Sequence, residues 1–173
     1  VDEIGQLLDH TGPVAQSELN AARIFNADHS YFVTNGTSTS NKIIWHASVT
    51  PGDIVLVDRN CHKSVIHAIT MTGAIPVFLM PTRNHLGIIG PIPLEEFDPE
   101  NIRKKIAQNP IAQKRKMEIG GDDALVPKIL TITQSTYDGI LYNVEMIKDH
   151  LTGHIDTLHF DEAWLPHAAF HDF

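Results

Sequence analysis

Hydroxyl and amide side chains fill the segment 35–41, which reads Asn-Gly-Thr-Ser-Thr-Ser-Asn. A β-type run, 30–34, precedes this segment, and a helical pattern follows it from about residue 40. Gly36 would allow a sharp turn of the backbone, and the free amides of a helix start suit a phosphate dianion. The terminal Gly-Lys-Ser/Thr of a Walker A loop is missing. Phosphate binding is one interpretation, and a strand-to-helix turn without a ligand is the other.

His62 is the first residue of a second candidate helix, directly after the predicted strand 53–58. The dipole at a helix start disfavours added positive charge, so the imidazole should stay neutral there. A neutral flat ring could stack on an aromatic cofactor, whereas the simpler alternative is a partly buried histidine bonded to backbone. The adjacent Lys63 is a possible Schiff-base amine, although a lysine on a helix surface is the more ordinary interpretation.

Asp161 follows the apolar run 157–160, so we expect it at the end of a strand. A carboxylate there is desolvated and needs a cationic or hydrogen-bonding partner. A protonated pyridine nitrogen would be such a partner, and a helix cap or an internal salt bridge is the alternative. Trp164, three residues later, offers an indole N–H and a flat face.

The histidines near the end of the sequence raise the question of a metal site. His167 and His171 are four residues apart, and His159, Asp161 and Glu162 lie close in sequence. Pro166 would interrupt a regular helix before His167, and no further pair of ligands is placed to close a site. We therefore predict no metal.

Strand-like and helix-like runs alternate along the chain, which predicts an α/β fold: a three-layer sandwich with a mainly parallel central sheet. The predicted strands are 30–34, 53–58, 75–79, 128–133 and 157–160. The predicted helices are about 17–25, with Ser17 as N-cap, 40–49, 63–72, 99–107 and 143–151. The polar segment 108–127 is expected to be a long exposed loop. Ligands of such sheets bind beyond the carboxyl ends of the strands, where the polar clusters fall.

Composition narrows the class of protein. The 173 residues suffice for one domain with a core, and a formal net charge of −8 argues against nucleic acid and anionic membranes as partners. The single cysteine, Cys61, makes an internal disulfide framework impossible, so we expect a cytoplasmic protein. No apolar run is long enough to span a bilayer.

Taken together, these segments resemble the bacterial Orn/Lys/Arg decarboxylases, a family of fold-type-I enzymes that use pyridoxal 5'-phosphate (PLP). The matching stretches occur in the family's order and cover nearly the whole chain, and the match looks closest to the lysine and arginine branches. They are residues 8–13, 34–42, 58–64, 87–92, 135–139 and 159–164.

The resemblance implies a role for each matching residue. The phosphate would be held by Thr37, Ser38 and the backbone of Gly36. His62 would stack on the pyridine ring, and Asp161 would pair with the ring nitrogen. Trp164 would lie against the cofactor near its phenolic oxygen. His62 and Asp161 would take part in catalysis.

The resemblance also implies a Ser-x-His-Lys segment after Asp161, whose lysine holds the cofactor, but the last lysine here is Lys148. We therefore expect residues 1–173 to be a truncated part of the major domain, without the wing and C-terminal domains of the parent protein. The fragment by itself should be inactive.

The parent is expected to be a homodimer or larger homo-oligomer that converts lysine, arginine or ornithine to an amine and CO2. Two alternatives stay open. One is another fold-type-I PLP enzyme, such as an aminotransferase or a lyase, and the other is a catalytically dead scaffold.

Overall fold

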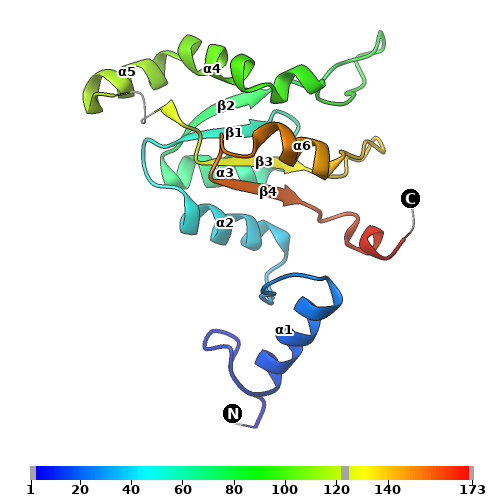
Figure 1. The fold of residues 1–173 in the computed structure, drawn as a ribbon. Helices are drawn as coiled ribbons and strands as arrows, with labels where there is room; N and C mark the ends of the chain where they lie inside the picture. Colours follow the sequence, from blue (N-terminus) through cyan, green and yellow to red (C-terminus); the bar gives the residue numbers. More distant parts are fainter. Residues whose placement is uncertain (1–2, 122–124, 172–173) are drawn as a thin grey trace. The chain divides into compact units, whose positions relative to one another are not determined.

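The computed structural model describes residues 3–121 and 125–171 (Figure 1). The chain forms two compact units, which are described separately. The larger runs from Thr37 to Pro166, and the smaller combines residues up to Gly36 with residues from His167 onward.

A four-stranded parallel sheet forms the centre of the larger unit, with the strand order β2-β1-β3-β4. The register places Asp58 beside Leu79 and Thr133 beside Asp161, so the carboxyl ends of neighbouring strands are level. The strands are β1 (Ile54–Asp58), β2 (Ile75–Leu79), β3 (Ile129–Thr133) and β4 (Thr157–Asp161).

Helices cover both faces of this sheet (Figure 1). One face carries α4 (Pro99–Gln108), α5 (Pro110–Ile119) and α6 (Val144–Leu151), together with the 3-10 helix η1 (Leu94–Phe97). The other face carries α2 (Thr37–Ser48) and α3 (Lys63–Thr72). The predicted three-layer α/β sandwich with a parallel sheet is confirmed.

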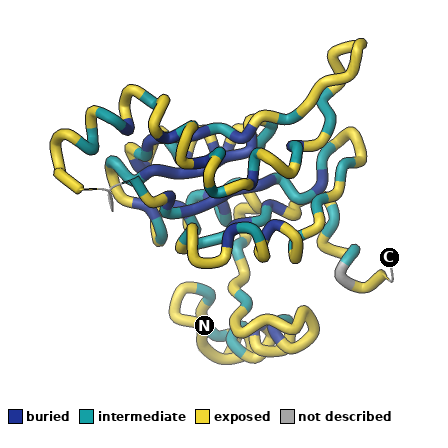
Figure 2. Tube along the Cα trace, turned by 45° about the horizontal axis from the view of Figure 1, so that its top comes forward, coloured by how far each residue is buried: buried dark blue, intermediate teal, exposed yellow. Residues whose placement is uncertain are grey.

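Alternate side chains of each strand enter two separate hydrophobic cores, as the period of a strand requires. Leu56 and Leu130 pack with Ile106 of α4 on one face. Val57 packs with Trp45 of α2 on the other face. Figure 2 shows the strands as the most continuously buried part of the chain, which is typical of a parallel sheet covered on both sides.

Two predicted elements are wrong. Residues 30–34 form no strand, because Tyr31 and Phe32 are exposed and the Phe32 amide donates to the carboxylate of Glu18 (2.9 Å) instead of to a neighbouring strand. The expected loop 108–127 contains α5, which the Asn109 side chain caps by accepting from two backbone amides. Proline at the first turn supports this helix start. Asp122 and Asp123 of the expected loop lie outside the described residues.

The smaller unit contains α1 (Gly12–Ile24), which begins five residues before the predicted start, so Ser17 is an interior residue and not the N-cap. Pro13 occupies the first turn, where its missing N–H costs nothing. The 3-10 helix η3 (Pro166–Phe170) ends within this unit, where the ring of Phe170 meets that of Phe25 edge to face.

A buried polar trio lies within the larger unit, on the α2 side of the sheet. The Trp45 indole donates to the Thr131 hydroxyl (3.1 Å), and that hydroxyl contacts Nδ1 of His159 at 3.1 Å. Because the tryptophan already donates to Thr131, the hydroxyl proton is available for His159. Burial lowers the pKa of His159, and the negative charge of Asp161 offsets this only in part.

This lowered pKa predicts a loss of stability in acid. The unfolded chain takes up a proton near the ordinary histidine pKa, whereas folded His159 does so only at lower pH. The free energy of unfolding should therefore fall below about pH 6.5, by up to about 1.4 kcal/mol per pH unit. Urea unfolding at pH 7.5 and 5.5 measures this. His159→Gln keeps an acceptor for Thr131 and should lose less stability, and equal losses would contradict the assignment.

Candidate functional site

A pocket of about 170 Å³ opens at the carboxyl end of the sheet, between the ends of β3 and β4 and the starts of α2 and α3. This is where a parallel sheet presents its ligand site. Every lining residue belongs to the larger unit. They are Thr37, Ser38, Asn60, His62, Thr133, Ser135, Thr136, Tyr137, Asp161, Ala163 and Trp164.

The pocket thus contains five of the six predicted site residues. Gly36 is the sixth, and it belongs to the smaller unit and is not a lining residue. Its φ of 75° lies in the left-handed region, where glycine is favoured, directly before α2. Thr37 and Ser38 form the first turn of this helix, whose first amides have no partner within the helix. They provide O–H and N–H donors of the kind that bind phosphate.

Asp161 is 7% exposed, and its carboxylate has two neutral partners. Oδ2 accepts from the Asn41 amide (2.9 Å), and Oδ1 accepts from the backbone amide of Ala163 (3.2 Å). Among the described residues, no lysine or arginine forms an ion pair with it. A buried carboxylate that lacks a cation is stabilised by one, so the pocket has a place for a positively charged group.

His62 is the N-cap of α3, and its Nδ1 accepts the backbone N–H of Ser64 (3.2 Å). An Nδ1 atom that accepts carries no proton, so the only ring proton is on Nε2 in this arrangement. The Ser64 hydroxyl lies 2.8 Å from the same nitrogen. The imidazole is exposed and lines the pocket, so its face is available to a flat ligand.

Trp164 also lines the pocket, and its ring meets that of Tyr137 edge to face, with the two ring centroids 4.6 Å apart. Both side chains are exposed, at 59% and 77%. This contact joins the loop after β3 to the loop after β4. The two rings add flat apolar surface to a pocket whose other lining residues are mainly polar.

Two buried hydroxyls in the pocket have no hydrogen-bond partner in the described part of the chain, Ser135 Oγ and Thr133 Oγ1. Unpartnered buried hydroxyls are costly, and a ligand with acceptor oxygens would satisfy them. Together with the start of α2 and the carboxylate of Asp161, they fit a ligand that is anionic at one end and cationic at the other. PLP with a protonated ring nitrogen has this pattern of charge.

Sequence reasoning did not assign a role to several residues of this site. Asn41 and Ser64 are buried behind the pocket and are linked to Asp161 and His62 by hydrogen bonds. Ser135 and Tyr137 line the pocket itself. All four lie within the stretches 34–42, 58–64 and 135–139 that resemble the family. These stretches were therefore the available signal, but the direction of each side chain decides which residues belong to the site, and the sequence does not give that direction.

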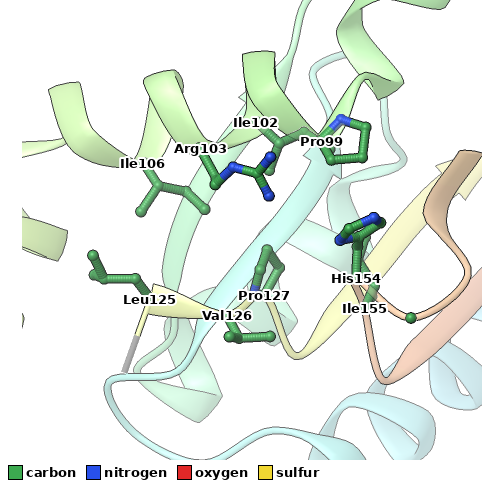
Figure 3. A pocket seen from close by; sticks show the side chains of 10 residues that line it. Pro99, Ile102, Arg103, Ile106, Leu125, Val126, Pro127, His154 and Ile155 are labelled. Carbon is green, nitrogen blue, oxygen red and sulfur yellow. The ribbon is translucent and has the colours of Figure 1, made fainter. Parts of the chain in front are cut away.

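A larger cavity of about 410 Å³ lies near the opposite end of the strands, beside Pro127 and Ile155 (Figure 3). Its walls are mainly apolar, and its charged side chain, Arg103, is paired with Glu100 at 2.5 Å. It has no hydroxyl or carboxylate among its lining residues, so it lacks the donors and acceptors that make the smaller pocket a candidate active site.

Within residues 3–121 and 125–171, no three histidine, cysteine or acidic side chains come close enough together to hold a metal ion. In the same ranges, no helix combines the length and the apolar character needed to cross a membrane.

The fold occurs in PLP-containing enzymes. The solved structure of cystalysin from Treponema denticola, which contains PLP, matches with a TM-score of 0.52 over 87% of this chain and 35% of that chain. At 15% identity this likeness concerns the fold alone. The larger unit therefore has the architecture of the fold-type-I PLP enzymes.

The sequence places the chain more narrowly. The profile of the family "Orn/Lys/Arg decarboxylase, major domain" matches residues 1–173, and the chain belongs to this family.

Two relatives illustrate the match. Lysine decarboxylase LdcA of Pseudomonas aeruginosa is 57% identical over 173 residues, which are 100% of this chain and 22% of that protein. Its solved structure matches with a TM-score of 0.90 over the same shares. The biodegradative arginine decarboxylase of Escherichia coli is 46% identical over 167 residues, or 96% of this chain and 21% of that protein. The chain thus spans about a fifth of the length of these relatives.

Cys61 provides a test of the packing beside His62. Burial, reinforced by the negative charge of Asp58, raises the pKa of its thiol to about 12. Because only the thiolate reacts, native Cys61 at pH 8 should react with a disulfide reagent roughly a thousandfold more slowly than the unfolded chain. Since Cys61 is the only cysteine, the absorbance of the released thiol reports it alone. Equal rates in buffer and in urea would show that this segment is not packed as described.

Proposed function

We propose that the chain is the cofactor-binding core of a PLP-dependent decarboxylase, which converts a basic amino acid to the corresponding amine and CO2. Membership of the Orn/Lys/Arg decarboxylase family supports the reaction. The main support for placing the reaction at this pocket is the buried carboxylate of Asp161. Its hydrogen-bond partners are neutral, and it faces a pocket whose hydrogen-bond donors are of the kind that bind phosphate.

Different pocket residues would bind different parts of the cofactor. Thr37, Ser38 and the first amides of α2 would bind the phosphate, with Gly36 allowing the turn that precedes them. Asp161 would hold a proton at the pyridine nitrogen. When bound, PLP supplies the electron-withdrawing ring that stabilises the carbanion left by loss of CO2. The negative charge of Asp161 keeps the ring protonated and thereby strengthens this effect.

The aromatic residues would position the ring. The exposed face of His62 would stack on it, with Nδ1 held by the amide of Ser64 so that the imidazole keeps one orientation. Trp164, supported by Tyr137, would cover the other exposed part of the pocket and exclude water from the reacting atoms. Water exclusion strengthens the interaction of Asp161 with a cation.

The substrate would be lysine, arginine or ornithine. The similarity to a lysine decarboxylase at 57% and to an arginine decarboxylase at 46% supports a basic side chain, with lysine favoured. The pocket residues would contact the cofactor end of such a substrate, so they would serve each of the three amino acids.

Asp161→Asn in the full-length protein tests the proposed role of the Asp161 charge in holding the proton at the pyridine nitrogen. The amide keeps the volume but removes the negative charge, so kcat for decarboxylation should fall at least about a hundredfold, the scale set by loss of one electrostatic contact in a transition state. The measurement is CO2 release with lysine, arginine and ornithine in turn.

The matched control is Asp156→Asn, because Asp156 is an exposed carboxylate directly before β4, at the other end of the strand from Asp161, and is paired with Lys128. This variant should keep wild-type activity. If the wild-type protein releases no CO2 from any of the three amino acids, or if Asp161→Asn remains fully active, the proposed function is wrong.

A second prediction concerns residues 1–173 alone. No lysine lines the pocket in the described part of the chain, and we propose that these residues by themselves neither bind PLP covalently nor catalyse decarboxylation. Treatment with PLP and then borohydride, followed by mass spectrometry, should find no lysine modified specifically. Stoichiometric labelling of Lys63, which is exposed beside His62, or of Lys42 would contradict this.

A further inference from the structure

Asn41 and Ser64 form a buried connection between the two residues that would contact the cofactor ring. The Asn41 side-chain nitrogen donates to Asp161 Oδ2 and to Ser64 Oγ, each at 2.9 Å. Ser64 Oγ in turn lies 2.8 Å from Nδ1 of His62. The connection therefore runs from the end of β4 through α2 to the start of α3.

The carboxylate of Asp161, at one end of this connection, determines the direction of every hydrogen bond in it. A carboxylate only accepts, so Asn41 must turn its NH2 group toward Asp161. The second hydrogen of that NH2 group then points to Ser64, whose oxygen accepts it. The Ser64 hydroxyl proton is left for His62 Nδ1, which also accepts the Ser64 backbone amide. The Ser64 backbone amide and hydroxyl thus favour the same tautomer of His62, and the charge of Asp161 orients the hydroxyl through the Asn41 amide.

Burial makes this arrangement specific. Asn41 and Ser64 are each 3% exposed, so water does not compete for their hydrogen bonds. Asn41 lies one turn before Trp45, whose side chain fills the core below α2. An apolar residue would suit that helical position better by propensity and packing. The two groups that its side-chain nitrogen contacts are Asp161 and Ser64.

We propose that Asn41 and Ser64 are positioning residues, which hold the Asp161 carboxylate and the His62 imidazole in fixed mutual orientation toward the cofactor ring. This inference rests on the proposed function, because it presumes that the ring lies between them. The connection fixes Oδ2 through Asn41, while the Ala163 amide fixes Oδ1. The plane of the carboxylate is thereby set before any ligand arrives.

The test uses Ser64→Ala in the full-length enzyme with PLP bound. The variant leaves His62 Nδ1 without its hydroxyl donor and Asn41 without one acceptor. We expect kcat to fall about tenfold or more through misorientation, and the pH midpoint of the absorbance change of bound PLP to move by about half a unit or more, because the hydrogen bonds around its charge partner change. Ser64→Thr keeps the hydroxyl and should restore both values.

The matched control is Thr72→Val on the same helix. The Thr72 hydroxyl is also buried, but it donates to the Ala68 carbonyl within α3 at 2.8 Å and has no link to the pocket. Both variants should lower the melting temperature. Only Ser64→Ala should move the absorbance midpoint, since loss of packing alone does not change the surroundings of Asp161.

Asn41→Ser tests the same connection from α2 and keeps the inference falsifiable if Ser64→Ala does not fold. Asn41→Ser should weaken PLP binding, measured by fluorescence titration. It should also shift the pH midpoint of the absorbance change in the same direction as Ser64→Ala does. Suppose that the wild-type enzyme binds PLP and decarboxylates, but the Ser64 or Asn41 variant has the same kcat and the same pH midpoint of absorbance as Thr72→Val. That result overturns this inference alone. A wild type that neither binds PLP nor releases CO2 overturns the proposed function instead.

Discussion

Asp161 is a carboxylate buried at the end of β4, an edge strand of the sheet, and its described hydrogen-bond partners are neutral. Removing a carboxylate from water costs several kcal/mol unless its oxygens are satisfied. The larger unit meets this cost with the Asn41 amide and the Ala163 backbone amide. Asn41 can reach Asp161 only because α2 packs against the face of the sheet from which Asp161 projects. The position of α2, and with it the phosphate-type donors of its first turn, is thus tied to this carboxylate.

The parallel sheet supplies the second constraint. Level registers between β3 and β4 place Thr133 beside Asp161, and the loops that follow these strands bring Ser135 and Trp164 to the same pocket. Both faces of the sheet are covered, so the strands are rigid and cannot slide without losing two cores. The pocket is therefore formed by the ends of rigid elements, which keeps its polar groups in place without a ligand.

Much of the site was predictable, because strand ends in α/β folds bear ligands. His62, Asp161 and Trp164 follow predicted strands that exist, whereas Thr37 and Ser38 follow the run 30–34, which forms no strand. The structure nevertheless places all five around one pocket. Their roles toward PLP remain proposals. Asn41 and Ser64 were not predicted as site residues. Each sits inside a helix, where sequence alone does not show whether a polar side chain faces water or a buried partner.

Local signals also failed where tertiary partners decide the conformation. The run 30–34 has strand propensity, but its Phe32 amide is satisfied by Glu18, which packs from α1 of the same unit. Strand propensity does not produce a strand unless a neighbouring strand is available. The polar segment 110–119 was predicted to be part of an exposed loop, yet the cap at Asn109 and the burial of Ala112 in the core beneath α5 are enough to form a helix.

The sequence by itself determined the alternation of strands and helices, the family, and the residue types at the strand ends, because these depend on periodicity and on local chemistry. Only the tertiary structure decided which side chains meet. The register made the strand ends level, and the packing of α2 and α3 on one face brought Asn41 and Ser64 between Asp161 and His62. Such contacts join residues up to 120 positions apart in the chain, and no local pattern specifies them.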